Sequence, residues 1–178
     1  MTIGNVQKLF QEFQSNLKTY YGYSGGSVKL ELIKYTCRCA TSFDAPALGE
    51  DAYGEFLLRS KNGEMAYLNA FTDLTYKEVD NLLSSHPKTS VLRPIERAKI
   101  LRRIYGGLAC DLDSEISPFE IDGLPLCPSC GSQQIASWEF KNPLEILDVP
   151  VQAVTHNRWS MLSDSEKLKL LDARLAIL

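Results

Sequence analysis

Hydrophobic positions along the chain repeat at two spacings, which predict helices near both ends and strands between them. Apolar side chains recur three and four residues apart over 5–21, the spacing of one face of a helix. Ser163 and Glu166 form a capping box, so a second helix is expected over about 164–177. Apolar and charged residues alternate over 28–32, which predicts a half-buried strand.

The middle of the chain contains the signal of a β-hairpin. Residues 54–60 and 64–70 flank Asn62 and Gly63. Asn-Gly is typical of a type I′ turn, in which both central residues adopt a positive φ. We therefore expect two antiparallel strands joined by this turn.

Two helices are predicted after the hairpin. Thr75 and Glu78 form a candidate capping box for a helix that reaches about Leu83. Pro94 suits the first turn of a further helix over about 95–105, which the glycine pair after it would end.

Three later segments complete the pattern. The stretch 111–122 carries five acids and no base, so we expect an exposed loop. Apolar residues alternate over 135–140, which predicts a strand. Residues 142–150 begin with Asn-Pro and an early glutamate, which indicate a short helix that ends before Pro150. Helices and strands in this order predict an α+β fold.

Composition narrows the class of protein and its compartment. The chain has 178 residues, 44% of them hydrophobic, and a net charge of −3, as in an ordinary globular protein. That charge argues against a dedicated nucleic-acid binder, which usually carries a basic surplus. The N-terminal residues lack the apolar run of a signal peptide, and no stretch reaches the ~20 apolar residues of a membrane span. We therefore expect a cytoplasmic protein with no membrane partner.

The five cysteines are the unusual count, because thiols stay reduced in the cytoplasm and paired cysteines there indicate metal or redox chemistry. Cys127 and Cys130 are separated by two residues, a spacing that lets a tight turn aim both sulfurs at one point. Cys37 and Cys39 form a second pair at the end of the first predicted strand. Together they supply the four thiolates that tetrahedral Zn²⁺ requires.

The segment Cys127-Pro-Ser-Cys130-Gly, with Cys37-x-Cys39, resembles the zinc ribbon superfamily. The resemblance implies structural zinc on these four cysteines and no activity. It implies a split ribbon whose halves cover about 28–40 and 124–141, with a hairpin and helices inserted over about 41–123. The helices at 5–21 and 164–177 flank this unit, and we expect residues 1–178 to form a single domain.

Two alternatives to a zinc site stay open for the cysteines. Cys127 and Cys130 could be a redox pair, or all five cysteines could be small buried apolar residues. Cys110 is unpaired in sequence, so partial burial is expected and a role as reserve ligand is the alternative. Lys34 and Arg38 lie near the first pair and could offset the charge of a four-thiolate zinc site.

Basic residues concentrate over 91–105, where the local charge is +4. On a helical wheel they wrap around the helix and form no single stripe. Neutralisation by the acidic stretch 111–122 is favoured over phosphate binding. The candidate partner or phosphate contacts are Arg97, Lys99, Arg102 and Arg103.

Three functions follow, in order of preference. The first is a non-enzymatic, zinc-stabilised interaction or regulatory protein, with a protein partner or a second copy docked on the C-terminal helix, which is apolar on two faces. The second is a nucleic-acid-binding zinc-ribbon protein. The third is an enzyme with an unrecognised site in the inserted region, where Asp111, Asp113 and Glu115 could bind Mg²⁺. The two histidines, His86 and His156, are expected to be structural or surface residues.

Overall fold

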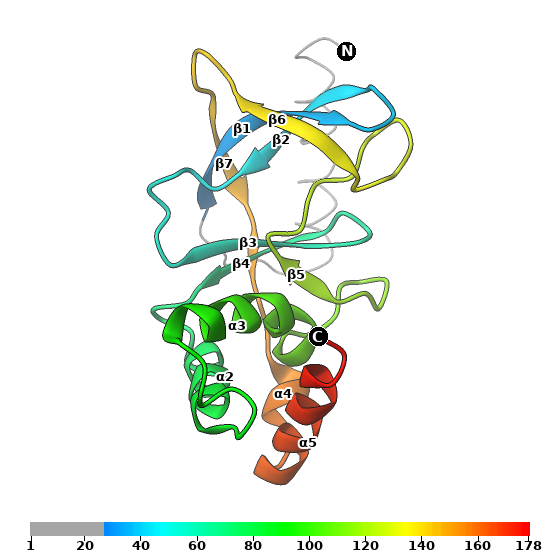
Figure 1. Cartoon of the computed structure of the whole chain (residues 1–178). Coiled ribbons are helices and arrows are strands. Elements are labelled where there is room, and N and C mark those ends of the chain that lie inside the picture. The colour runs from blue at the N-terminus through cyan, green and yellow to red at the C-terminus, as the bar shows by residue number, and fades with distance from the viewer. Residues whose placement is uncertain (1–26) are drawn as a thin grey trace.

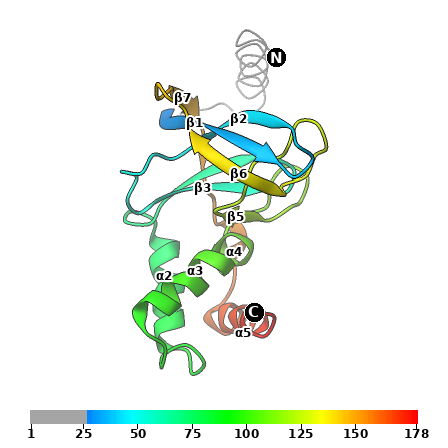
Figure 2. The ribbon, with the colours of Figure 1, turned by 45° about the horizontal axis from the view of Figure 1, so that its top comes forward.

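The structure is a computed structural model and describes residues 27–178. The predicted helix over 5–21 lies outside the described residues. In this part of the chain two sheets are stacked, and four helices lie beyond the second sheet (Figures 1 and 2). This arrangement confirms the predicted α+β class.

The first sheet is built around the long strand β1. One edge of β1 pairs with β2, and the other edge pairs with β7 along its first half and with β6 along its second half. All these pairings are antiparallel. The strands are β1 (Ser27–Cys37), β2 (Ser42–Ala47), β6 (Ile135–Phe140) and β7 (Ile146–Pro150).

The second sheet separates the first sheet from the helices. Side chains along its central strands point alternately to the two faces of the sheet. Leu57 and Tyr67 pack toward the first sheet, while Leu58 and Leu68 pack toward the helices. In spatial order, its strands are β5 (Phe119–Ile121), β3 (Glu55–Ser60), β4 (Met65–Asn69) and β8 (Gln152–Ala153). The chain passes from β7 in the first sheet to β8 in the second through the buried Val151.

The largest core of the described residues lies between the second sheet and the helices. Tyr105, Trp159 and Leu171 are its fully buried members from three different helices. The helices are α2 (Leu74–Ser85), α3 (Pro94–Ala109), α4 (Asn157–Ser160) and α5 (Asp164–Leu175). None of them combines the length and apolar character that crossing a membrane requires.

Several predicted elements are confirmed. The strand over 28–32 lies within β1, the hairpin is β3 and β4, and the strand over 135–140 is β6. The capping box of Ser163 and Glu166 opens α5, and Pro94 opens α3.

The hairpin turn and the cap of α2 differ from expectation. Gly63 has a φ of 89°, but Asn62 does not adopt a positive φ, so the turn is not type I′. The amide of Ser60 donates to Glu64 across a three-residue loop, in which only the last position requires glycine. The N-cap of α2 is Asp73, whose carboxylate accepts the amide of Tyr76 at 2.7 Å.

The predicted helix over 142–150 is wrong, since this segment contains strand β7. Leu147 and Val149 pair with Leu30 and Val28 of β1, and Val149 is buried. The pairing offers a full ladder and an apolar face, which outweigh the local helix-start signal.

The glycine pair does not end α3, which continues to Ala109. Gly106 lies against β5, and a β-carbon there would overlap the carbonyl of Phe119. The glycine is therefore explained by the close approach of helix and strand.

Only part of the apolar surface of α5 is covered. Leu171 is buried, and Leu170 and Leu175 pack against the core. Leu168, on the predicted face of Leu171, and Ile177, on the predicted face of Leu170, remain exposed, so the described residues cover each of the two faces only in part. A partner on the exposed part of this helix stays a prediction.

Candidate metal centre

The pairing of β1 with β6 brings the two cysteine pairs together. Cys37, the last residue of β1, pairs with Ile135, the first residue of β6. The amide of Arg38 donates to the carbonyl of Gln134 at 2.9 Å and extends this contact into the loop. Cys39 and Cys127, 88 positions apart in sequence, are thereby neighbours.

The first pair lies on the tight turn between β1 and β2. The amide of Cys37 donates to Thr41, and the amide of Ala40 donates back to Cys37, both at 2.9 Å. Ala40 has a φ of 67°, in the left-handed region. This three-residue turn explains the single-residue spacing, because a strand end and a turn position present Cys37 and Cys39 to the same point.

The second pair, Cys127 and Cys130, lies on a tight turn of the kind that binds a metal through two cysteines, called a knuckle below. The amide of Gly131 donates to the carbonyl of Cys127 at 2.8 Å, and the amide of Cys127 donates to Ser132 at 2.9 Å. Gly131 has a φ of 67°, a left-handed conformation that glycine adopts without strain. The turn therefore directs the thiols of Cys127 and Cys130 toward the first pair.

The four thiols form a compact cluster. The sulfurs of Cys37, Cys39, Cys127 and Cys130 all lie within 4.8 Å of one another. The Sγ–Sγ distance is 3.6 Å from Cys37 to Cys130 and also from Cys39 to Cys127. Four sulfurs at about 2.3 Å from a central zinc would form a tetrahedron with edges of about 3.8 Å. The cluster therefore has the size of a four-thiolate zinc site.

Crowding of the thiols makes simultaneous ionisation costly without a cation. Hydrogen bonding to Thr41 lowers the pKa of Cys39 to about 6. The Ser132 amide favours the thiolate of Cys130, but the adjacent Cys39 and Cys37 thiols outweigh it and raise the pKa of Cys130 to about 12. One thiol ionises readily and its neighbour resists, as expected for like charges in contact. A divalent cation at the centre would relieve this repulsion.

Burial divides the cluster into an inner and an outer half. Cys37 and Cys127 are buried, whereas Cys39 and Cys130 are exposed. Both Sγ–Sγ contacts of 3.6 Å run between the two segments, and all four cysteines are free thiols. The geometry therefore favours a shared metal over a redox pair of Cys127 with Cys130.

Residues considered as additional ligands lie elsewhere. Cys110 ends α3 inside the main core, and burial raises the pKa of its thiol. His86 contacts Asp172 at 3.0 Å, and His156 contacts Asp73 at 2.8 Å. Both histidines are thus engaged in the structure, as expected.

The two basic residues near the first cysteine pair have different surroundings. The ammonium group of Lys34 is 2.9 Å from Glu139 on β6, so its charge is already paired. Arg38 is exposed on the turn itself. Arg38 is therefore the remaining candidate to offset the charge of a four-thiolate site.

The acidic stretch 111–122 is not the simple exposed loop that we expected. The carboxylate of Asp111 accepts the amides of Asn157 and Arg158 at the start of α4. Asp113 is buried and accepts the amide of Ser117. These carboxylates are used as caps of backbone amides, so the magnesium alternative loses its support.

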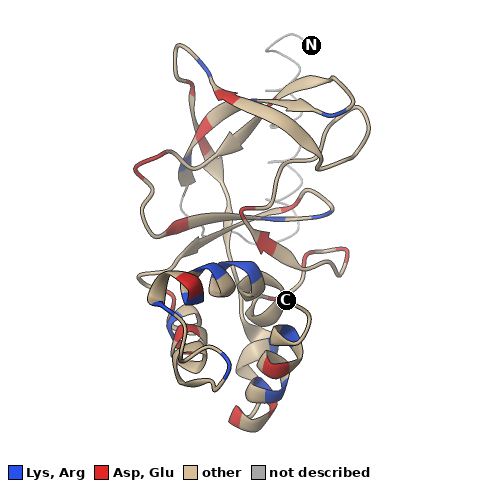
Figure 3. Cartoon of the chain, viewed as in Figure 1, with Lys and Arg blue, Asp and Glu red and all other residues tan. Residues whose placement is uncertain are grey.

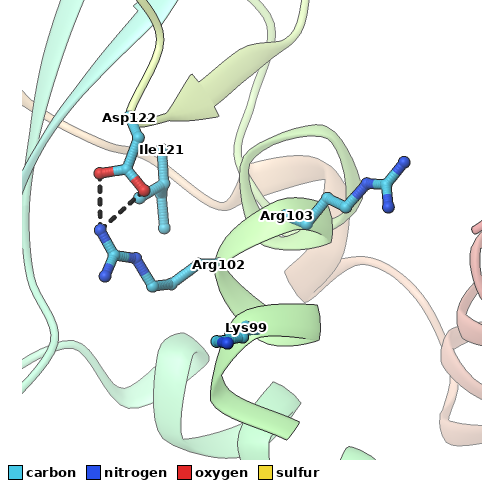
Figure 4. Close-up of a pocket in the computed structure, with 5 residues that line it drawn as sticks. All are labelled: Lys99, Arg102, Arg103, Ile121 and Asp122. Atoms are coloured by element: carbon cyan, nitrogen blue, oxygen red, sulfur yellow. Dashed lines mark hydrogen bonds and ion pairs between the residues drawn. The ribbon is translucent and has the colours of Figure 1, made fainter. Parts of the chain in front are cut away.

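Three of the four candidate basic residues line one pocket, although the basic residues of this segment as a whole wrap around the helix. Lys99, Arg102 and Arg103 of α3 line one pocket with Ile121 and Asp122 (Figure 4). Arg97 does not line this pocket, and its guanidinium donates to the carbonyl of Leu92 at 2.7 Å. Arg102 forms an ion pair with Asp122 of the acidic stretch, which is one instance of the expected neutralisation.

Comparison of the chain with protein-family models, with curated proteins and with solved structures finds no match. The resemblance to zinc ribbons therefore depends on the knuckle sequence and on the geometry of the four thiols. Membership of that superfamily stays a prediction.

Proposed function

We propose that the protein is a non-enzymatic interaction protein whose fold is stabilised by one structural Zn²⁺. The observation that carries the proposal is the cluster of four sulfurs within 4.8 Å, drawn from two distant segments of the chain. Four thiolate ligands complete the tetrahedral shell and leave no position for a reactive water. The expected role of the metal is therefore structural.

The position of the cluster supports this role. The loop that carries the knuckle also contacts the second sheet, because the amide side chain of Gln133 donates to Ser60 at 3.4 Å and to Leu124 at 2.8 Å. The cluster joins this loop to the β1–β2 turn of the first sheet. Bound zinc would fix the position of the two sheets relative to each other at this end.

Exposed aromatic residues on β6, the strand that follows the second cysteine pair, support an interaction role. Trp138 and Phe140 of β6 are 56% and 40% exposed, and their ring centroids are 5.4 Å apart. Large aromatic side chains are enriched in protein-binding surfaces. In the described part of the chain, β6 pairs with β1 alone, so the strand presents a free edge. A cytoplasmic location and a protein partner belong to the same proposal.

Nucleic-acid binding is supported less well. Lys34 and Arg102 are paired with Glu139 and Asp122, which reduces the positive charge available to a phosphate backbone. Figure 3 shows acidic residues on the strands next to the basic residues of α3.

Metal analysis of the purified chain tests the proposal. We expect one zinc per chain, and we expect Cys127→Ser with Cys130→Ser to lose it and to lower the melting temperature. Cys110→Ala is the matched control, since this cysteine lies in the main core and outside the cluster. That variant should retain one zinc whatever its stability.

Hydrogen exchange locates the effect of the metal. Removal of zinc by a chelator should speed exchange in the β1–β2 turn and in residues 124–134, and much less in the main core. A protein without zinc, or one whose melting temperature and exchange are unchanged by the chelator, would contradict a structural metal. Zinc retained by the double serine variant would contradict the ligand assignment.

A further inference from the structure

A basic pocket lies between α3 and the end of β5, on a different part of the molecule from the thiol cluster. It has a volume of about 380 Å³ and is lined by five residues: Lys99, Arg102, Arg103, Ile121 and Asp122. Figure 4 shows Lys99 one turn before Arg102 and Arg103 on α3, with Arg102 directed toward Asp122 and Arg103 directed away from it. Positions i, i+3 and i+4 lie on one side of a helix, which explains why these three share the pocket.

The charges of the pocket do not cancel. The pocket is lined by three basic residues and by a single carboxylate, that of Asp122. Only Arg102 is paired with it, at 2.6 Å and 2.7 Å from one guanidinium nitrogen to the two oxygens. Within residues 27–178, Lys99 and Arg103 form no ion pair. The pocket thus has two cations in excess.

Arg102 is held in place before any ligand arrives. Its guanidinium lies 5.1 Å from the centre of the Phe56 ring, and Asp122 contacts it from the end of β5. Asp122 has a φ of 64°, a left-handed conformation that aspartate tolerates better than most residues. A preorganised guanidinium loses less conformational entropy when it binds an anion.

The geometry points to a binding site for a small phosphorylated ligand at Lys99, Arg102 and Arg103. A phosphate group offers oxygens to several donors at once, and guanidinium groups match it well. The phosphate would take the place of Asp122 as the partner of Arg102. The buried Ile121 supplies an apolar wall for the remainder of the ligand.

A small ligand fits the pocket better than a nucleic acid does. The three basic residues lie within about one turn of α3, which is too short a stretch to follow the repeating phosphates of a nucleic-acid backbone. Acidic residues flank α3 on the neighbouring strands (Figure 3). They would repel the next phosphates of a polymer.

Titration of the full-length, zinc-loaded chain tests this site. The probes are inorganic phosphate and phenyl phosphate at low salt, followed by amide NMR shifts or by calorimetry. Shifts should concentrate around Lys99 and Arg103 on α3 and around Asp122. Tighter binding of phenyl phosphate would identify a phosphomonoester as the ligand class, and equal affinity would identify free phosphate.

Variants that are expected to weaken phosphate binding and a variant expected to tighten it make the test specific. Lys99→Gln with Arg103→Gln should weaken phosphate binding by about tenfold or more, because two charge-assisted contacts are lost. Lys88→Gln with Lys169→Gln is the matched control, since it removes the same charge from exposed residues outside the pocket. Asp122→Asn should tighten binding several-fold, because the competing carboxylate is removed while asparagine tolerates the same φ.

Three results would overturn the inference. They are no binding at millimolar phosphate, equal loss in the control pair, and unchanged or weaker binding in Asp122→Asn. A short oligonucleotide that binds far more tightly than phenyl phosphate, with a steep salt dependence, would replace the site with a nucleic-acid interface. Zinc content is measured on the same samples, so failure of this site is distinguishable from failure of the proposed metal.

Discussion

Gly106→Ala tests how closely α3 is seated on β5, and Gly107→Ala provides the neighbouring control. A β-carbon at Gly106 would overlap the carbonyl of Phe119, which belongs to a strand held by its pairing with β3. At Gly107 the nearest atom is the Arg174 Nη2, at 3.1 Å, the far end of a flexible side chain. The two substitutions thus add the same atom to rigid and to adaptable surroundings.

The expected magnitudes follow from this difference. Alanine gains about 1 kcal/mol over glycine inside a helix. Overpacking that a side-chain rotation cannot relieve costs up to about 3 kcal/mol, so Gly106→Ala should destabilise the protein by about 2 kcal/mol. In a chain of this size that corresponds to a fall in melting temperature of about 4–8 °C. Gly107→Ala should change stability by less than about 1 kcal/mol, since the helix gain is offset by a shift of Arg174.

Urea and thermal unfolding of the zinc-loaded proteins, followed by circular dichroism, provide the measurement. Zinc content serves as an internal control and should be the same in both variants, because neither glycine contacts the thiol cluster. A Gly106→Ala protein as stable as the parent would refute the close approach of helix and strand. Equal destabilisation by the two variants would show that helix geometry, and not the contact with Phe119, is responsible.

The remaining predictions concern acid stability and the β1–β2 turn. Burial alone would raise the pKa of Asp73 and of Asp111, but the hydrogen bonds that each accepts lower it below the ordinary 3.8. The stability that these two carboxylates contribute to the fold is therefore complete above about pH 4 and is lost as the pH falls below that value. Urea unfolding measured at several pH values should show a smaller loss of stability at acid pH for Asp111→Asn than for the parent. Ala40→Gly should stabilise the chain by about 0.5–1 kcal/mol, because glycine adopts a φ of 67° without strain. An unchanged urea midpoint for Ala40→Gly, with zinc still bound, would contradict this.

The parts of the fold that sequence predicted well depend on local chemistry. The turn after Cys127 requires a left-handed residue, and the sequence places Gly131 there. The capping box of Ser163 and Glu166 satisfies backbone groups within one turn, so α5 begins where predicted. Such signals need no knowledge of distant residues.

The sequence-based predictions were wrong where a segment far away in the sequence decides the local structure. Local signals in 142–150 favour a helix, but β1 offers that segment a ladder partner and an apolar face. Lys99, Arg102 and Arg103 of α3 are spaced so that they share one side of the helix, but the sequence does not show that the end of β5 closes a pocket beside them with Ile121 and Asp122. The acidic stretch looked like a solvated loop, since nothing local shows that Asp111 caps a helix more than 40 residues later.

The placement of the cysteines follows from how unevenly the apolar core is distributed. Among residues 27–178, the cluster packed around Ile33, Tyr35 and Ala45 at this end of the first sheet is small, whereas the core beneath the second sheet includes fifteen buried residues. A cross-link between Cys39 and Cys127 closes a loop of 88 positions, for which the entropic stabilisation is about 4–5 kcal/mol. A metal that joins these segments would therefore stabilise the molecule where hydrophobic burial contributes least. The helical end, which has the larger core, has no such requirement and is open to carry a ligand pocket.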